Sequence, residues 1–178
     1  MSKIAVRLFC VAAAAVVAGC AGYSWKSGVP AGMRTVSVPV FRNETFVTGL
    51  GNEVTRQILR EFQREGTFKI VSSDDAALEV QGILTGESAS DAAFSRSTGD
   101  RYRESRFKVT AKVSVIDKKR GRVLVDNREY VAMTTYLDDS DAVSRKRDAS
   151  GRIGEEFARK IIDDILEMEI EDVEDNAK

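Results

Sequence analysis

The most regular hydrophobic pattern in the chain is a strict alternation over residues 106–116. One phase of the alternation is apolar and consists of Phe107, Val109, Ala111, Val113 and Val115. The other phase is polar and consists of Arg106, Lys108, Thr110, Lys112 and Ser114. One buried face and one solvated face are typical of a strand in an antiparallel sheet that is covered on one side. The pattern therefore predicts a long, half-buried strand.

A partner for this strand follows at once in the sequence. Residues 117–122 form a basic turn, and residues 123–136 return as a second long strand. The apolar phase changes between Val125 and Tyr130, which indicates a β-bulge near residues 126–127. Together the two strands predict a long antiparallel hairpin.

Three shorter strands are expected before the hairpin, at residues 35–41, 67–71 and 77–85. Pro39 lacks a backbone N–H, which places it at a sheet edge or at the end of its strand. Residues 88–98 are rich in serine, alanine and aspartate. This composition leaves two alternatives, an exposed loop that reaches into a partner or a plain turn between strands.

Two segments have the periodicity of amphipathic helices. The first has apolar residues at a spacing of four, namely Leu50, Val54, Ile58 and Phe62, and Gly66 stands where a C-terminal cap is expected. The second carries the stripe Ile153, Phe157, Ile161, Ile165 and Met168. Residues 138–140 have the composition of a helix N-cap, although basic residues 145–147 and Gly151 leave room for a loop before this second helix. Residues 171–178 are acidic, and we expect them to form a disordered tail.

The order of these elements predicts the fold class. Each helix has one apolar stripe, and the best strand has one apolar face, so two packed layers satisfy both. We expect an α+β two-layer sandwich, in which two helices pack on one face of a mainly antiparallel, mixed sheet of about four strands. Parallel pairing is expected between the strands that flank the first helix.

Residues 1–19 have the composition of a secretory signal peptide. A basic start and the apolar run 8–17 are followed by Ala18 and Gly19, and then by Cys20. The run is too short for a membrane-spanning helix, which needs about 20 apolar residues. The four residues that end at Cys20 resemble the bacterial lipobox, in which the cysteine is lipidated and becomes the mature N-terminus.

This resemblance implies a covalent anchor of N-acyl and S-diacylglycerol lipid at Cys20. Each buried methylene contributes about 0.8 kcal/mol, so several chains hold a protein stably on a bilayer. Residue 21 is alanine and not the aspartate that retains lipoproteins in the inner membrane, so the expected location is the periplasmic face of the outer membrane. Residues 20–34 contain glycine and proline and are expected to be a tether, followed by a single domain over residues 35–170.

The composition excludes several classes of function. The chain contains no histidine, which argues against serine–histidine and cysteine–histidine hydrolases and against ordinary zinc sites. We therefore expect neither an enzyme nor a metal site, and no cofactor beyond the lipid at Cys20. Cys10 lies in the leader, so the mature domain has no second cysteine for a disulfide. The formal net charge of −1 gives no indication of nucleic-acid binding.

The mature sequence resembles the LPS-assembly lipoprotein family, LptE, over nearly its whole length. The shared features, in order, are Cys20 followed by Gly22-Tyr23, Pro30 before the first strand, VSVPVFRNET at 36–45, LGNEVT at 50–55, Gly82, the long alternating hairpin and an acidic last helix. The resemblance implies a non-catalytic α/β domain that plugs the β-barrel translocon LptD. It also implies that the domain helps the barrel to assemble and helps lipopolysaccharide to reach the outer leaflet.

A valine-rich strand that ends in phenylalanine and asparagine also occurs in other periplasmic lipoproteins. The alternative function is therefore that of a regulatory lipoprotein, which binds a cell-wall synthase or a secretion pore. A hydrolase is a third class, but it would need a catalytic base that the sequence does not provide.

The basic residues suggest where lipopolysaccharide would bind. Arginine binds phosphate through two parallel hydrogen bonds, and lipopolysaccharide carries phosphates on its lipid A and inner core. We predict that Arg96, Arg101, Arg145 and Lys146 contact these phosphates near one end of the domain. The alternative is that these charges only keep loops soluble or match acidic groups in the barrel.

Overall fold

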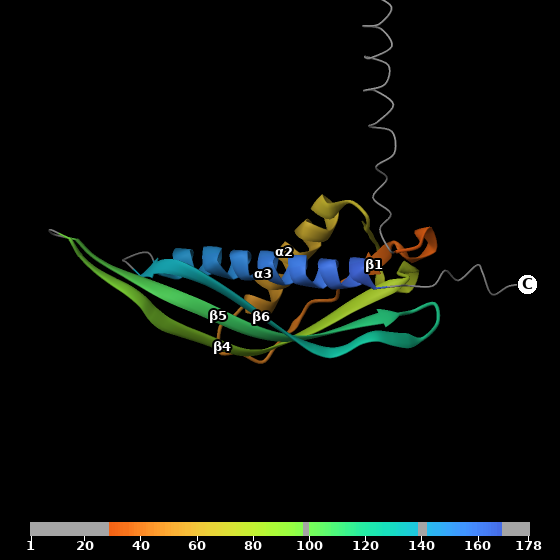
Figure 1. Ribbon diagram of the computed structural model, residues 1–178. Helices are drawn as coiled ribbons and strands as arrows, with labels where there is room; N and C mark the ends of the chain where they lie inside the picture. The colour runs from red at the N-terminus through yellow and green to blue at the C-terminus, as the bar shows by residue number, and fades with distance from the viewer. Residues whose placement is uncertain (1–28, 98–99, 139–141, 169–178) are drawn as a thin grey trace, which may run out of the picture.

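The computed structural model describes residues 29–97, 100–138 and 142–168 (Figure 1). Its helices are α2 (Leu50–Glu65) and α3 (Ala142–Glu167), and its 3-10 turns are η2 (Ala31–Met33) and η3 (Ser73–Asp75). Its strands are β1 (Thr35–Ser37), β2 (Arg42–Asn43), β3 (Lys69–Ile70), β4 (Leu78–Ser97), β5 (Asp100–Asp117) and β6 (Arg122–Asp138). This architecture confirms the predicted α+β sandwich, with six strands in the sheet and not about four.

The sheet is mixed, as predicted. Its strand order is β3-β1-β4-β5-β6, and β2 pairs with β4 beyond β1. The three long strands β4, β5 and β6 are antiparallel, whereas β1 and β3, which flank α2, pair in parallel. The register between β5 and β6 shifts next to Val115, and Asn127 on β6 has a φ of 45°. The predicted bulge at residues 126–127 is therefore confirmed.

Both helices lie on the same side of the sheet, and α2 crosses α3 (Figure 1). The crossing is close because Gly154 on α3 has no side chain. A Cβ atom at Gly154 would lie 2.7 Å from Cβ of Gln57 and 3.0 Å from the carbonyl oxygen of Val54. Glycine at this position lets the two backbones approach closely, so the helices form one layer over the sheet.

The core lies between the two layers, and Phe41 occupies its centre. The Phe41 ring is fully buried against Gly82 on β4, where a Cβ atom would lie 2.1 Å from the ring. The Phe41 amide donates to Oγ1 of Thr55 at 2.9 Å, and that hydroxyl donates to the carbonyl of Gly51 at 2.7 Å. The ring is thus held between the sheet and the first turn of α2.

The predicted interruption at residues 88–98 is wrong. Residues 88–97 are not a loop or a turn, because β4 continues through them to Ser97 and pairs with β5 along its whole length. Pairing with β5 outweighs a composition that is unfavourable to a strand. For the last helix, the structure agrees with the earlier of the two predicted starts, because α3 begins at Ala142, directly after the predicted cap, and residues 145–147 belong to it.

The predicted lipid anchor and most of the expected tether lie outside the described residues, as do the predicted signal peptide 1–19 and the predicted tail 171–178. From Val29 onward the chain belongs to the folded unit. Val29 and Met33 are buried in the main core, and Arg34 donates from Nε to the carbonyl of Val29 at 3.1 Å. The packed domain therefore begins before β1.

Candidate functional site

A groove of about 790 Å³ runs between the start of α2 and the first turns of α3. Its lining includes Val47, Thr48, Gly49, Leu50, Asn52, Glu53, Arg56, Ser144, Lys146, Arg147, Asp148 and Ser150. A second groove of about 500 Å³ shares several of these residues and continues along the two helices past Arg60 and Arg152. The helix layer therefore carries an extended depression that is lined by more cations than carboxylates. The cations are Arg56, Arg60, Lys146, Arg147 and Arg152, and the carboxylates are Glu53, Asp148 and Glu155.

The cations of the groove differ in how they are held. Lys146 places its ammonium 5.5 Å from the centre of the buried Phe107 ring, so its stem is ordered by the core. Arg56 is paired with Glu53 on the same helix. Arg147 is exposed, and within the described part of the chain it has no hydrogen bond or ion pair. Arg147 is therefore available to an anionic ligand without the loss of an existing contact.

The first turn of α2 adds a favourable field to the groove. Gly49, which lines the groove, precedes the helix with a φ of 78°, and no side chain caps the helix there. Uncapped N–H groups and the helix dipole give a helix N-terminus a partial positive charge. The dipole and the side chains of Lys146 and Arg147 thus favour the same kind of ligand, an oxyanion such as phosphate.

The four residues predicted to bind lipopolysaccharide lie toward one end of the fold. Lys146 lines the groove, and Arg145 precedes it on α3. Arg96 and Arg101 are register partners near the tip of the β4–β5 hairpin. The same end holds the start of α3, because β6 ends at Asp138 opposite Arg103 (Figure 1). The side chains of Arg96, Arg101 and Arg145 lie outside the described atoms.

Sequence reasoning missed the contribution of α2 to this groove. Arg56 and Arg60 are one helical turn apart on the polar face of α2, which is a pattern that most solvated helices share. Only the crossing of the two helices shows that this face meets Lys146 and Arg147.

The family model for LptE, described as lipopolysaccharide-assembly, matches residues 33–168. The chain belongs to the LptE family. The match begins at the end of η2 and ends just past α3, so it covers the whole sheet and both helices. No curated protein matches the chain.

This LptE-family chain is similar to several solved structures at low sequence identity. The hypothetical protein CT253 from Chlamydia trachomatis is 11% identical, with a TM-score of 0.50, over 74% of this chain and 95% of its own. A candidate lipoprotein from Caulobacter crescentus CB15 is 18% identical, with a TM-score of 0.46, over 76% and 90% of the two chains. A minor lipoprotein from Acinetobacter baumannii is 10% identical, with a TM-score of 0.42, over 75% and 93%.

A polar cluster around Glu79 fixes the end of the sheet opposite the groove. Glu79 accepts hydrogen bonds from the hydroxyl of Ser73 and from Nε2 of Gln81, and Nζ of Lys118 lies 3.3 Å from its carboxylate. These contacts lower the pKa of Glu79 to about 2. The hydrogen bond from Ser73 contributes most, followed by that from Gln81, and Lys118 contributes less. The turn between β5 and β6 is thereby tied to η3.

Lys119, which follows Lys118 in the β5–β6 turn, connects this turn to η2. Its Nζ donates a hydrogen bond to the carbonyl of Gly32 at 2.7 Å. The turn also contains Asp117, which is fully buried and lies 3.6 Å from Nε of Arg122. These contacts make the Glu79 cluster a structural clamp, and its side chains are already engaged with one another.

Among the described residues, no group of three or more histidine, cysteine, aspartate or glutamate side chains is placed to hold a metal ion. Within the same residues, no helix combines the length and the apolar character needed to cross a membrane.

Proposed function

We propose that this LptE-family protein is an outer-membrane lipoprotein, anchored through Cys20, that binds inside an LptD-like β-barrel. In this role it helps the barrel to assemble and helps lipopolysaccharide to reach the outer leaflet, without catalysis. The observation that carries the proposal is the family match over the whole folded domain, residues 33–168. The lipobox-like sequence before Cys20 supports the anchor.

The groove between α2 and α3 supports a direct role for the domain in handling lipopolysaccharide. The phosphates of lipid A would be recognised by Arg147 and Lys146, assisted by the N-terminus of α2. Arg96, Arg101 and Arg145 would extend this recognition toward the hairpin tip. The binding mode needs no covalent chemistry, only charge complementarity and an apolar surface nearby for the acyl chains.

The partner assignment is tested by isolating the tagged mature protein from outer membranes. We expect a large β-barrel protein to copurify, identified by mass spectrometry and by its heat-modifiable migration in gels. Recovery of a peptidoglycan synthase or a secretion pore in its place would support the alternative, a regulatory lipoprotein. In the same cells, Cys20→Ala should release the protein from the membrane fraction, and tight residual binding would contradict the lipid anchor.

The ligand assignment is tested with charge reversal at Arg147. Arg147→Glu should weaken lipopolysaccharide binding roughly fivefold, since an exposed charge-assisted contact is worth about 1 kcal/mol. Lys69→Glu is the matched control, because Lys69 is an exposed cation on β3 that does not line the groove. Reversing the charges of Arg96 and Lys146 together should weaken lipopolysaccharide binding further. Equal affinity for native and dephosphorylated lipopolysaccharide would refute phosphate recognition.

A further inference from the structure

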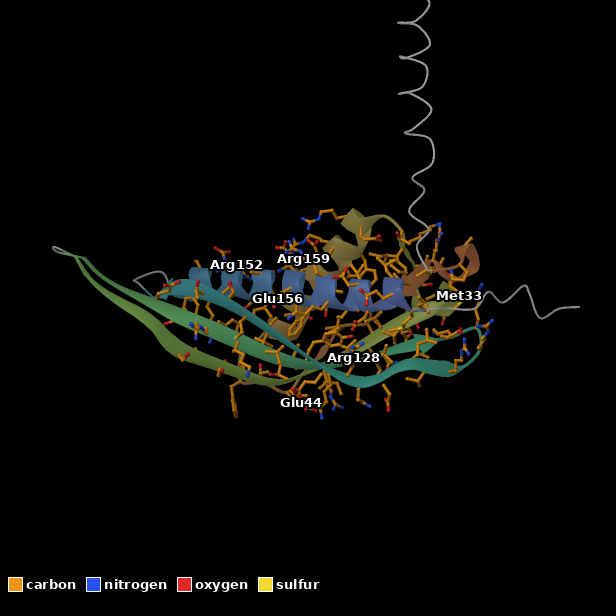
Figure 2. The ribbon with its side chains drawn as sticks, in the orientation of Figure 1. Met33, Glu44, Arg128, Arg152, Glu156 and Arg159 are labelled. Carbon is orange, nitrogen blue, oxygen red and sulfur yellow. The ribbon has the colours of Figure 1, made fainter. Side chains whose placement is uncertain are left out.

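The two edges of the long β4–β5–β6 sheet are protected very differently. At the β6 edge, side chains of α3 satisfy the outward backbone groups. The bonds run from Nζ of Lys160 to the Val131 carbonyl at 2.5 Å, from the Met133 amide to the Glu156 carboxylate at 3.0 Å, and from Nη2 of Arg152 to the Thr135 carbonyl at 2.8 Å. Figure 2 labels Arg152 and Glu156 on α3. Over residues 131–135 this edge is therefore closed to an added strand.

The outer edge of β4 is closed only over its first part. β1 pairs with Leu78 and Glu79, and β2 pairs with Ile83 and Leu84. The last backbone bond on this side runs from the Glu44 amide to the Leu84 carbonyl at 2.9 Å. Beyond Leu84, none of the described strands pairs with this side of β4, although β4 continues to Ser97. Figure 1 shows the tip of the β4–β5 hairpin projecting beyond the end of α3.

The open edge has no lysine, no proline and no covering strand among the described strands. Soluble proteins protect sheet edges with charged side chains, above all lysine, and with proline, bulges or covering elements. Residues 86–91 of β4 read Gly-Glu-Ser-Ala-Ser-Asp, so the charged residues of this segment are Glu87 and Asp91, near its two ends. Bulges occur only at the two ends of this segment, between Leu84 and Gly86 and between Asp91 and Ala93. Residues 88–90 are exposed, so a strand could approach the regular stretch between the bulges.

An exposed aromatic side chain stands next to the point where this open edge begins. Phe46 is 99% exposed and lies two residues after the last bond to β4. Its loop is ordered by Asn43, whose Oδ1 accepts from the Thr45 amide at 3.1 Å and whose Nδ2 donates to the Val47 carbonyl at 2.9 Å. A preorganised aromatic residue costs little entropy to bind, which is typical of an interface anchor.

We propose that an extended segment of the barrel partner adds as a further strand to residues 86–91 of β4 and places an apolar side chain against Phe46. Backbone hydrogen bonds would supply much of the affinity, as in other cases of strand addition. The strands of a closed barrel are already paired on both sides, so the added segment must be one that is not part of the barrel wall. This inference rests on the proposed function, and it adds the surface and the chemistry of the contact.

The test is site-specific photo-crosslinking in the membrane-bound complex. A photoreactive residue at Ser88 is compared with one at Met133, since both register with Lys108 on β5 and are exposed at opposite edges of the sheet. We expect Ser88 to crosslink to a segment of the barrel protein that lies outside its transmembrane strands. Met133 should not crosslink to that segment.

Hydrogen exchange and a variant at Phe46 provide independent readouts. Backbone amides in residues 86–91 should exchange more slowly in the complex than in the free protein. Phe46→Ser should weaken the complex about tenfold or more, whereas Val123→Ser, at another exposed apolar residue, should leave it unchanged.

Each contrary result has a distinct meaning. If the barrel copurifies but residues 86–91 neither crosslink to it nor gain protection, strand addition is refuted while the proposed function stands. A crosslink from Ser88 only to a second copy of this chain refutes the partner assignment. If no barrel copurifies, the proposed function fails and the inference fails with it.

Discussion

The contact between Gly82 and Phe41 gives a prediction whose sign differs from the usual expectation. Alanine in place of an interior strand glycine is ordinarily stabilising by about 0.5–1 kcal/mol, because it lowers the entropy of the unfolded chain. At Gly82 the new Cβ atom would lie 2.1–2.4 Å from three carbons of the Phe41 ring. Gly82→Ala should therefore destabilise the protein.

The magnitude follows from how firmly the ring is held. The Phe41 amide is bonded to Thr55, and Phe41 packs in the core between β4 and α2, so the ring has little room to move. Overpacking a core of this kind costs typically 1–3 kcal/mol, and full loss of a buried phenylalanine costs about 3–5 kcal/mol. After the entropic gain is subtracted, we expect Gly82→Ala to lower the free energy of unfolding by roughly 1–3 kcal/mol.

Urea unfolding of the purified protein measures this change against a matched control. Gly86 also lies on β4, but a Cβ atom there would meet nothing within 4 Å, so Gly86→Ala should be neutral or slightly stabilising. Phe41→Leu should relieve the clash, which a double-mutant cycle detects as a favourable coupling of about 1 kcal/mol or more. Equal stability of the Gly82→Ala and Gly86→Ala proteins would refute the packing argument, and so would the absence of coupling.

Three further predictions concern other contacts of the fold. The pKa of Glu79 is lowered to about 2, so its ionised carboxylate stabilises the fold above about pH 4.5, and this stabilisation is lost as the pH falls toward 2. Glu79→Gln should therefore flatten this part of the stability–pH curve, measured by thermal unfolding. Gly154→Ala should destabilise the helix crossing by about 1–2 kcal/mol in urea unfolding, whereas Gly151→Ala should be neutral or stabilising by up to about 1 kcal/mol. Replacing Arg152 and Lys160 together with alanine should uncover the β6 edge and raise self-association in light scattering, and an unchanged signal would contradict their protective role.

The parts of the fold that the sequence predicts are those where one local pattern dominates. Alternation over residues 106–116 predicts β5 because each side chain chooses between a core face and a solvent face. The stripe from Leu50 to Phe62, with Gly66 after it, predicts α2 and its end, and Gly66 does adopt a φ of 84° as the cap. The change of apolar phase after Val125 predicts the bulge.

The missed features depend on contacts between distant segments. Residues 88–97 have weak strand propensity, yet they form a strand because β5 offers a continuous partner for their backbone. The close crossing at Gly154 depends on Val54 and Gln57 of α2, which lie far earlier in the chain. The groove also depends on this contact between distant segments. The charge of Lys146 makes it a candidate from the sequence alone, but only the crossing of the two helices brings Arg56 and Lys146 to the same groove.

The contacts along the long hairpins differ from one end of the sheet to the other, and this difference implies a gradient of local stability. Near the β5–β6 turn, Lys118 and Lys119 join separate segments of backbone, so opening there requires the loss of several contacts at once. Around Ser88, where the side chains are solvated and one strand edge is unpaired, few contacts oppose opening. Amides near Ser88 should therefore exchange through small fluctuations, and those near Asp117 only when the whole domain unfolds. A protein built in this way can adjust its shape to a partner at one end without risk to its fold.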